Sequence, residues 1–266
     1  MTRIKSRLGW VKDLPDPRDH LYSAPAQILQ ALPEKVLLQT DFPVYDQGRI
    51  GSCTANALSA AVEFDRLKSN EHPTFTPSRL FIYYNERQIE GDTGMDGGAQ
   101  LRDGIKTLVK QGICPDSDWP YDDTPPLTEG GPFPPGSKPA TKPPKSCYDE
   151  AKAFVITSYQ RLNQSLVQLQ GCLAAGYPFS FGFSVFSGWY NHLPHATIIP
   201  IPSQTDSVVG GHAVLCVGYD NQSRLFKIRN SWGSNEGENG YFYMPYSYLT
   251  ESSLAGDFWV INAVKS

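Results

Sequence analysis

The stretch GRIGSCTANALSAAVEF, residues 48–64, places a cysteine directly before a run of small and apolar residues. Apolar side chains recur at helical spacing from Ala57 to Leu67, which predicts a mostly buried helix with Ser52 as its N-cap. Cys53 would then lie in the first helical turn, where unpaired backbone N–H groups and the helix dipole favour a thiolate over a thiol. An ordinary buried core cysteine is the alternative. The position after a glycine and a cap residue favours a reactive nucleophile.

The chain is long enough for a sizeable core but lacks the charge of a nucleic-acid-binding protein. Its 266 residues are 40% hydrophobic and carry a formal net charge of -4, which predicts one large domain or two small ones. This balance argues against nucleic acid or an anionic membrane as a partner. The opening MTRIKSRLGWVKDLPDPRDH has charges where a signal peptide needs an apolar segment, and no apolar run reaches transmembrane length. We therefore expect a cytoplasmic protein, unless another export route applies.

The cysteines do not form a metal-binding pattern. They are Cys53, Cys114, Cys147, Cys172 and Cys216. None of them forms a CxxC pair or a zinc spacing, so we expect no metal site, and the odd count leaves at least one thiol outside any intrachain disulfide. Cys172 and Cys216 lie on apolar faces and are predicted to be buried thiols. Whether Cys114 and Cys147 pair is left open.

The first half of the chain predicts helices behind an irregular extension. Residues 1–31 contain DLPDPRD and no sustained periodicity, so we expect extended or irregular chain over a surface. A second helix is predicted with Thr76 as N-cap, Pro77 at the first helical position and Gly91 past its end. A third helix is predicted over residues 101–111. Three helices therefore precede residue 113.

The second half predicts strands. Residues 124–146 hold many prolines and are expected to form a long exposed loop, because proline removes backbone donors. After a short helix capped by Ser165 and Gly176, segments with a period of two follow: PFSFGFSVF, HAVLCVGYD, LFKIRNSW, GYFYM and DFWVINAV. Helices first and antiparallel strands later indicate an α+β protein with segregated layers.

One histidine has the sequence context of a catalytic base. His212 opens the predicted strand HAVLCVGYD, which a short turn joins to LFKIRNSW. If Tyr219 lies opposite Leu225 in this hairpin, His212 falls near Trp232 and diagonal to Asn230, at about 7 to 8 Å between backbones. Strand alternation places His212 and Asn230 among apolar neighbours, where a buried polar group needs a partner. A purely structural bond is the alternative, but a thiolate nucleophile also needs a base and a group that orients it.

Five segments make the chain resemble papain-family cysteine peptidases from about residue 32 to near the C-terminus: DQGRIGSCTANA, GMDGGAQ, DSDWPYDD, GGHAVLCVGYD and RNSWGSNEGENGYFYM. The opening LGWVKDLPDPRDHLYS is similar to the start of bacterial members. The resemblance implies an α+β papain-like fold with a helical subdomain over residues 32–150 and a β-barrel-like subdomain over residues 151–266. The active-site cleft would lie between them. It implies a cysteine endopeptidase acting on polypeptides without metal or cofactor, which we expect to be a monomer.

The resemblance assigns roles to individual residues. Cys53 attacks the scissile carbonyl, His212 is its ion-pair partner and protonates the leaving amine, and Asn230 orients the imidazole. Gln47 contributes a side-chain amide to the oxyanion site, with the Cys53 backbone N–H as the second donor. The residues expected to bind substrate or shield the site are Gly97, Gly98, Gly211 and Trp232. The two glycines before Ala99 would pair with an extended substrate.

The chain also departs from the family pattern. Ile50 stands where the family has a cysteine, Thr54 where it has an aromatic residue, and Met95 where the disulfide partner would be. That disulfide is therefore absent. The floor of the main specificity pocket is expected near Leu254 or Ala255, with an apolar character.

Residues 1–31 occupy the place of a propeptide, which leads to the hypothesis of a zymogen-like latch. The segment would pack along the body and partly cover the cleft; a structural strap without inhibition is the alternative. Two other functions remain open. The same Cys, His and orienting residue serve acyltransferases of the transglutaminase type, and a permanently covered cleft would suit a non-catalytic binding protein.

Overall fold

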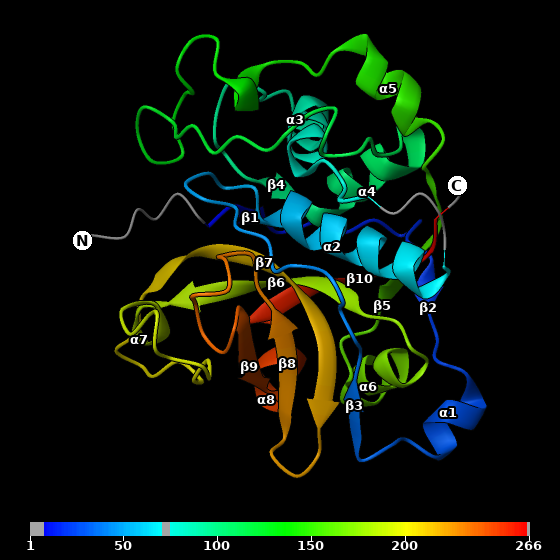
Figure 1. Cartoon of the computed structure of the whole chain (residues 1–266). Helices are drawn as coiled ribbons and strands as arrows, with labels where there is room; N and C mark the ends of the chain where they lie inside the picture. Colours follow the sequence, from blue (N-terminus) through cyan, green and yellow to red (C-terminus); the bar gives the residue numbers. More distant parts are fainter. Residues whose placement is uncertain (1–7, 71–74, 265–266) are drawn as a thin grey trace.

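The computed structural model describes residues 8–70 and 75–264. The helices are α1 (Ala26–Gln30), α2 (Cys53–Lys68), α3 (Arg79–Glu90), α4 (Leu101–Lys110), η2 (Lys138–Ala140), α5 (Lys145–Ala151), α6 (Leu166–Ala174), α7 (Ser187–Tyr190) and α8 (Tyr246–Thr250). The strands are β1 (Trp10–Val11), β2 (Leu21–Tyr22), β3 (Lys35–Leu37), β4 (Ala99–Gln100), β5 (Ile156–Leu162), β6 (Phe179–Phe186), β7 (Val208–Asp220), β8 (Leu225–Arg229), β9 (Tyr241–Pro245) and β10 (Ala255–Val264). Helices α2 to α5 lie on one side and most of the sheet on the other (Figure 1). The α+β prediction is confirmed.

The strands form one large sheet and one small one. The large sheet has the order β2-β5-β10-β6-β7-β8-β9, and β3 pairs with β7 off this path. Its neighbours are antiparallel except β2 and β5. Among the described residues, the first and last strands of this order, β2 and β9, do not pair with each other. The sheet therefore does not close into the barrel that the β-barrel-like subdomain would suggest. β1 and β4 form a separate parallel pair.

Helix α2 carries the cysteine at its first residue, as predicted. It is buried over nearly its whole length, because helices α3 and α4 cover one side and strands β7 and β10 the other. Ser52 occupies the N-cap position, but its side chain makes no capping hydrogen bond. Its hydroxyl instead contacts the Tyr121 hydroxyl at 2.5 Å. The cap prediction is therefore right in position and wrong in chemistry.

Helix α3 begins later than predicted. Its N-cap is Ser78, whose side-chain oxygen accepts a hydrogen bond from the Phe81 N–H, and its first residue is Arg79. Thr76 and Pro77 remain outside, where Pro77 forms a bridge with Pro115. A hydroxyl two residues further along the chain thus provides the cap, which satisfies a free N–H of the first turn. Gly91 ends the helix with a φ of 78°, as predicted.

The proline-rich segment 124–146 is more ordered than a plain exposed loop. It includes the 3-10 turn η2 and the start of α5, and it buries Phe133 and Pro139. The side chain of Arg87, on α3, holds this segment and the preceding loop. It donates hydrogen bonds to the carbonyl oxygens of Tyr83 (3.0 Å), Thr93 (3.0 Å), Met95 (2.7 Å) and Pro139 (2.5 Å). One buried arginine side chain therefore connects two loops that lie far apart in the sequence.

We expect Arg87→Met to lower the free energy of unfolding by about 3 kcal/mol, because it leaves several buried carbonyl oxygens without a donor. Urea unfolding followed by far-UV circular dichroism measures the change. Arg49→Met is the matched control, since Arg49 lies half exposed beside Asp123 and such a pair contributes about 1 kcal/mol or less. Equal shifts in the two variants would contradict the role of Arg87.

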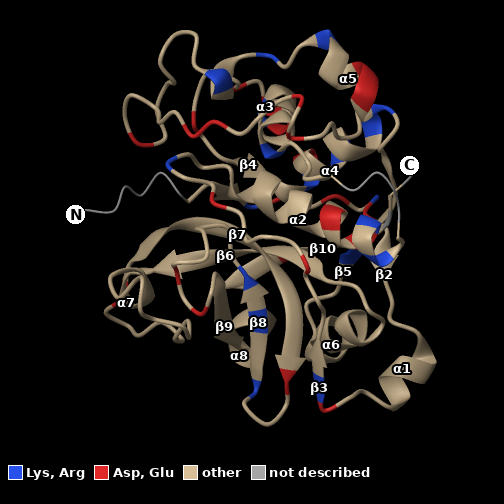
Figure 2. Cartoon of the chain, viewed as in Figure 1, with Lys and Arg blue, Asp and Glu red and all other residues tan. Residues whose placement is uncertain are grey.

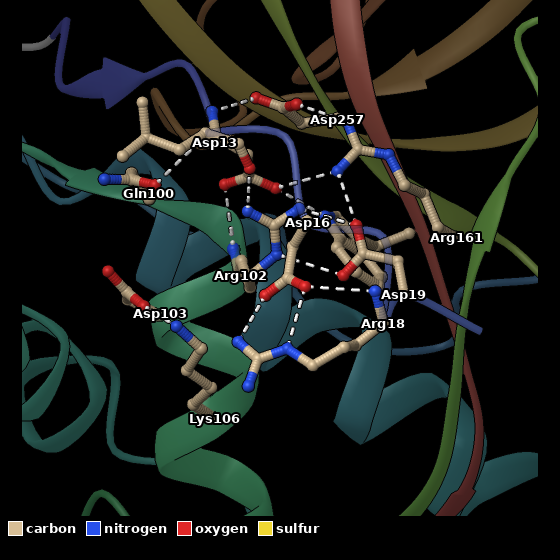
Figure 3. Close-up of polar contacts among 12 residues, drawn as sticks. Asp13, Asp16, Arg18, Asp19, Gln100, Arg102, Asp103, Lys106, Arg161 and Asp257 are labelled. Carbon is tan, nitrogen blue, oxygen red and sulfur yellow. Dashed lines mark hydrogen bonds and ion pairs between the residues drawn. The ribbon is translucent and has the colours of Figure 1, made fainter. Parts of the chain in front are cut away.

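The N-terminal segment crosses between the helices and the sheet (Figure 1). An ionic network fastens it (Figure 3): Arg102 of α4 pairs with Asp19 at 2.6 Å, and Arg161 of β5 bridges Asp19 at 3.1 Å and Asp257 of β10 at 2.8 Å. The Asp13 N–H also donates to Asp257 at 2.7 Å. Burial, together with the nearby Asp257 carboxylate, raises the pKa of Asp13 to about 6. Residues 13–19 are thus anchored to three separate elements of the body.

Charged residues of both signs are interspersed over the helices and the sheet (Figure 2). Within residues 8–70 and 75–264, no helix has the length and apolar character needed to cross a bilayer.

Candidate active site

The turn before α2 is held rigidly in front of Cys53. The Gly51 N–H donates to both carboxylate oxygens of Asp96, at 3.0 and 3.1 Å, and the Tyr83 hydroxyl contacts the same carboxylate at 2.5 Å. Asp96 lies in the GMDGG segment. The sequence predicted a role for the last two glycines of this segment but none for the aspartate. Its carboxylate fixes the position of the cysteine because it pairs a backbone N–H two residues upstream.

His212, Asn230 and Trp232 meet as the hairpin prediction required. The His212 Nε2 atom lies 2.7 Å from the Asn230 Oδ1 atom, and the imidazole stacks on Trp232 with 4.6 Å between ring centroids. All three side chains are buried. The asparagine oxygen can only accept, so Nε2 carries the proton. This contact fixes the imidazole ring and leaves Nδ1 as its second functional nitrogen.

The register that creates this contact contains a compensating irregularity. Tyr219 pairs with Phe226, not with Leu225, so the predicted register was off by one residue near the turn. A shift between Cys216 and Gly218 removes the error, and the register beyond it matches the prediction. A bulge inserts one extra residue into one strand, so it shifts the pairing by one residue and offsets the error of one residue near the turn. Strand β7 also starts at Val208, before the predicted start at His212.

The Cys53 side chain lies beside Ala213, the residue that follows His212. Backbone groups of Ala213, Gly9 and Thr54 hydrogen-bond to the Cys53 side chain. Burial nevertheless raises the pKa of the Cys53 thiol to about 12, and these three hydrogen bonds oppose the rise only in part. In this covered arrangement, removal from water therefore opposes the thiolate that the helix N-terminus was expected to favour.

Gln47 lies in the turn before α2 and is held by the segment that follows β8 and carries Asn230. Its Nε2 atom donates to the Ile50 carbonyl oxygen at 2.9 Å, and its Oε1 atom accepts from the Ser231 hydroxyl at 2.7 Å. The Gln47 N–H donates to the Ser231 carbonyl oxygen at 2.8 Å. Ser231 was not singled out from sequence, although it stands between Asn230 and Trp232. It fixes which end of the amide faces the cysteine turn.

The predicted substrate-binding glycines are occupied by the protein's own chain. The Ala99 N–H donates to the Gly9 carbonyl oxygen at 2.8 Å, and a Cβ at Gly98 would overlap that same carbonyl. Gly98 has a φ of 76°, which also favours glycine. A Cβ at Gly211 would overlap the Trp10 carbonyl oxygen. The N-terminal segment therefore lies along the surface that the sequence assigned to an extended substrate.

The remaining site predictions fall close to this surface. A Cβ at Gly97 would meet an Asp92 carboxylate oxygen at 3.1 Å, so Gly97 faces its own loop and not the N-terminal segment. Ala255 is buried and Leu254 is half-buried, both in the apolar cluster of the sheet. Ala255 also lines a cavity together with Asp257 and Arg161, so the surroundings of the predicted pocket floor are partly charged. Within the described part of the chain, no group of three His, Cys, Asp or Glu side chains is arranged to hold a metal ion.

Known proteins are similar to this chain over nearly its whole length. The sequence model of a protein family, described as papain family cysteine protease, matches residues 34–257 of the chain. The crystal structure of xylellain, a cysteine protease from Xylella fastidiosa, matches with a TM-score of 0.96 and 52% sequence identity, covering 100% of this chain and 99% of that chain.

More distant proteins are similar in sequence or in structure. Uncharacterized peptidase C1-like protein L477 of Acanthamoeba polyphaga mimivirus is 36% identical over 287 residues, covering 98% of this chain and 88% of the viral protein. The structure of proCathepsin B S9 from Trypanosoma congolense has a TM-score of 0.73 at 16% identity, covering 98% of this chain and 87% of that chain. The likeness spans both the helices and the sheet.

Proposed function

Because the chain belongs to the papain family of cysteine proteases, and so is a cysteine-type peptidase, we propose that Cys53, His212 and Asn230 are its catalytic residues. The observation that supports this most is the 2.7 Å contact between the His212 Nε2 and Asn230 Oδ1 atoms. Ala213, the residue after His212, hydrogen-bonds to the Cys53 side chain through its backbone. Nucleophile, base and orienting group are thus neighbours in space.

In the proposed reaction, His212 takes the proton of the Cys53 thiol, and the sulfur attacks the scissile carbonyl carbon. The Cys53 N–H and the Gln47 side-chain amide donate to the oxyanion that forms. The C–N bond then breaks, the imidazolium gives its proton to the leaving amine, and a thioester remains. Water, deprotonated by His212, attacks the thioester and releases the free acid together with the thiol.

The same site supports the latch hypothesis for the N-terminal segment. Gly9 contacts the Cys53 side chain through its backbone, and Trp10 pairs with Ala99 in the β1–β4 ladder. A substrate needs the same surface, so the segment and the substrate exclude each other. Residues 13–19 stay fixed by their ionic network while residues 8–12 leave the site. In the covered state burial keeps Cys53 a neutral thiol, which makes it a poor nucleophile.

Trp10→Ala is expected to raise the rate of peptide hydrolysis by the full chain roughly tenfold, because it removes apolar surface that holds the latch closed. Alkylation of Cys53 by iodoacetamide at pH 8 should accelerate in parallel, because less burial lowers the Cys53 pKa toward its usual value. Fluorogenic peptide hydrolysis and mass spectrometry of the labelled cysteine measure both.

The matched control is Leu14→Ala, an exposed residue of the same segment outside the covered site. It should leave both rates unchanged. If Trp10→Ala matches the control, the segment is a structural strap and the latch hypothesis is wrong.

The experiment that tests the peptidase function follows the products of the acyl-enzyme. The full chain and the Trp10→Ala variant are incubated with a fluorogenic peptide in the presence of a primary amine, and the acyl product is identified by mass spectrometry. Predominant free acid supports a peptidase; predominant new amide indicates an acyltransferase of the transglutaminase type. No acyl product from either protein would indicate a cleft that only binds.

We also propose that the cleft separates the helical part, residues 32–150, from the strand-rich part, residues 151–266, with polypeptides as substrates. Helices α3 to α5 lie on one side of the molecule and most strands on the other (Figure 1), which supports this division. A monomeric state remains a prediction that sedimentation can test.

A further inference from the structure

We infer that the side-chain pocket next to Cys53 selects a tryptophan residue of the substrate. The carboxylate of Asp257 would accept a hydrogen bond from the indole N–H, and Gly182 would leave space for the ring. The inference rests on the proposed peptidase function and names the substrate class of the same site. Trp10 occupies this pocket in the covered state and shows which chemistry fits it.

The first observation is the absence of a side chain below the Trp10 ring. A Cβ at Gly182, in the middle of β6, would overlap the indole. Gly211 on β7 has a similar role, since a Cβ there would meet the ring carbon Cε3 at 2.9 Å. Neither glycine has a positive φ, so any residue could adopt the backbone conformation. Glycine is therefore needed at both places for the space it leaves.

The second observation is a buried acceptor at the end of this space. The Trp10 Nε1 atom donates to the Asp257 Oδ2 atom at 3.1 Å. Asp257 is buried, and it keeps a φ of 55°, a conformation that aspartate and asparagine tolerate better than most residues. The same oxygen also accepts the Asp13 N–H at 2.7 Å, so a ring without an N–H, such as phenylalanine, would fill the pocket but remove one of the two donors to this oxygen.

The third observation concerns charge. The other carboxylate oxygen of Asp257 pairs with Arg161 at 2.8 Å, as Figure 3 shows. Arg161 belongs to β5, a strand of the large sheet. The acceptor is therefore already paired with a cation of the body, which reduces the gain from a second cation and favours a neutral N–H donor over the side chain of arginine or lysine.

The position along the substrate follows from the neighbouring contact. Gly9 lies over Cys53 and the next residue, Trp10, fills the pocket. Trp10 follows Gly9 in the chain and β1 runs parallel to β4. In a substrate that runs in the opposite direction to this segment, with its scissile residue over Cys53, the pocket accepts the side chain second from the scissile bond. The proposed pocket has a glycine floor with a polar end, beside the apolar floor that the sequence predicts near Leu254 or Ala255.

The test uses the full chain with Trp10→Ala, which empties the pocket, and fluorogenic peptides that differ only at the second residue from the scissile bond. We expect kcat/KM for the tryptophan peptide to exceed that for phenylalanine roughly tenfold, as for a hydrogen bond to a charged group. Arginine and alanine peptides should be slower still. Equal rates for tryptophan and phenylalanine, or a preference for arginine, overturn the inference.

Two further variants in the Trp10→Ala chain assign the effect to the two residues. Asp257→Asn should reduce the tryptophan over phenylalanine ratio in kcat/KM, because its amide oxygen is a weaker acceptor than a carboxylate oxygen. Gly182→Ala should lower kcat/KM for both aromatic peptides at least tenfold relative to the alanine peptide. Unchanged ratios in both variants would place the selection elsewhere.

Binding separates this inference from the peptidase function. Calorimetry with the Trp10→Ala, Cys53→Ala double variant measures affinity for the same peptides without hydrolysis. Tighter binding of the tryptophan peptide supports the pocket even if no peptide is cleaved. Equal or undetectable binding of the tryptophan and phenylalanine peptides overturns it, even if cleavage occurs.

Discussion

Cys53→Ala is expected to abolish peptide hydrolysis, lowering kcat/KM on the order of 10⁵-fold in both the full chain and the Trp10→Ala variant. In the proposed mechanism the Cys53 sulfur forms the bond to the scissile carbonyl, and alanine has no group that could replace it. Because the thiol is buried and neutral in the covered state, the alanine variant should fold normally. Fluorogenic hydrolysis, with thermal unfolding as a check of folding, measures the effect.

Cys172→Ala is the control for this experiment. Its thiol is equally buried but belongs to the cluster between α6 and the sheet, away from the cysteine turn. Its activity should match that of the parent protein. Residual hydrolysis in Cys53→Ala within tenfold of the parent would show that another nucleophile carries the reaction.

Gln47→Ala is expected to lower kcat by about 10² to 10³-fold with little change in KM, because an oxyanion donor acts mainly in the transition state. The Ser231→Ala variant is the informative partner. It keeps the Gln47 amide but removes the hydroxyl that holds its oxygen at 2.7 Å, so we expect a smaller loss. Steady-state kinetics separates the two parameters. A change confined to KM would assign Gln47 to substrate binding instead.

Several features of the site were predictable because they depend on local patterns. The helix that begins at Cys53 follows from its apolar spacing, and the pairing of His212 with Asn230 follows from strand alternation across a short turn. These relations join residues close in sequence, or in adjacent strands, where spacing determines geometry. Even the error of one residue near Tyr219 did not change the result, since the bulge restored the register.

Other features could not be predicted because many competing residues satisfy the same local pattern. Thr76 and Ser78 are both plausible caps, and only packing decides that Ser78 is used. The pKa of Cys53 depends on burial as well as on its helix position, and burial is a property of the assembled molecule. Arg87 resembles any polar residue of a helix until the loops that it holds have folded around it.

The sequence by itself determined the order of helices and strands, and it predicted a set of candidate catalytic residues and an irregular segment before the body. Only the tertiary structure decided where that segment lies and what it contacts. Trp10 and Asp257 are separated by 247 positions, and nothing local to either residue specifies their hydrogen bond. Periodicity reports which face of an element is buried, whereas the occupant of a pocket depends on which distant segment reaches it.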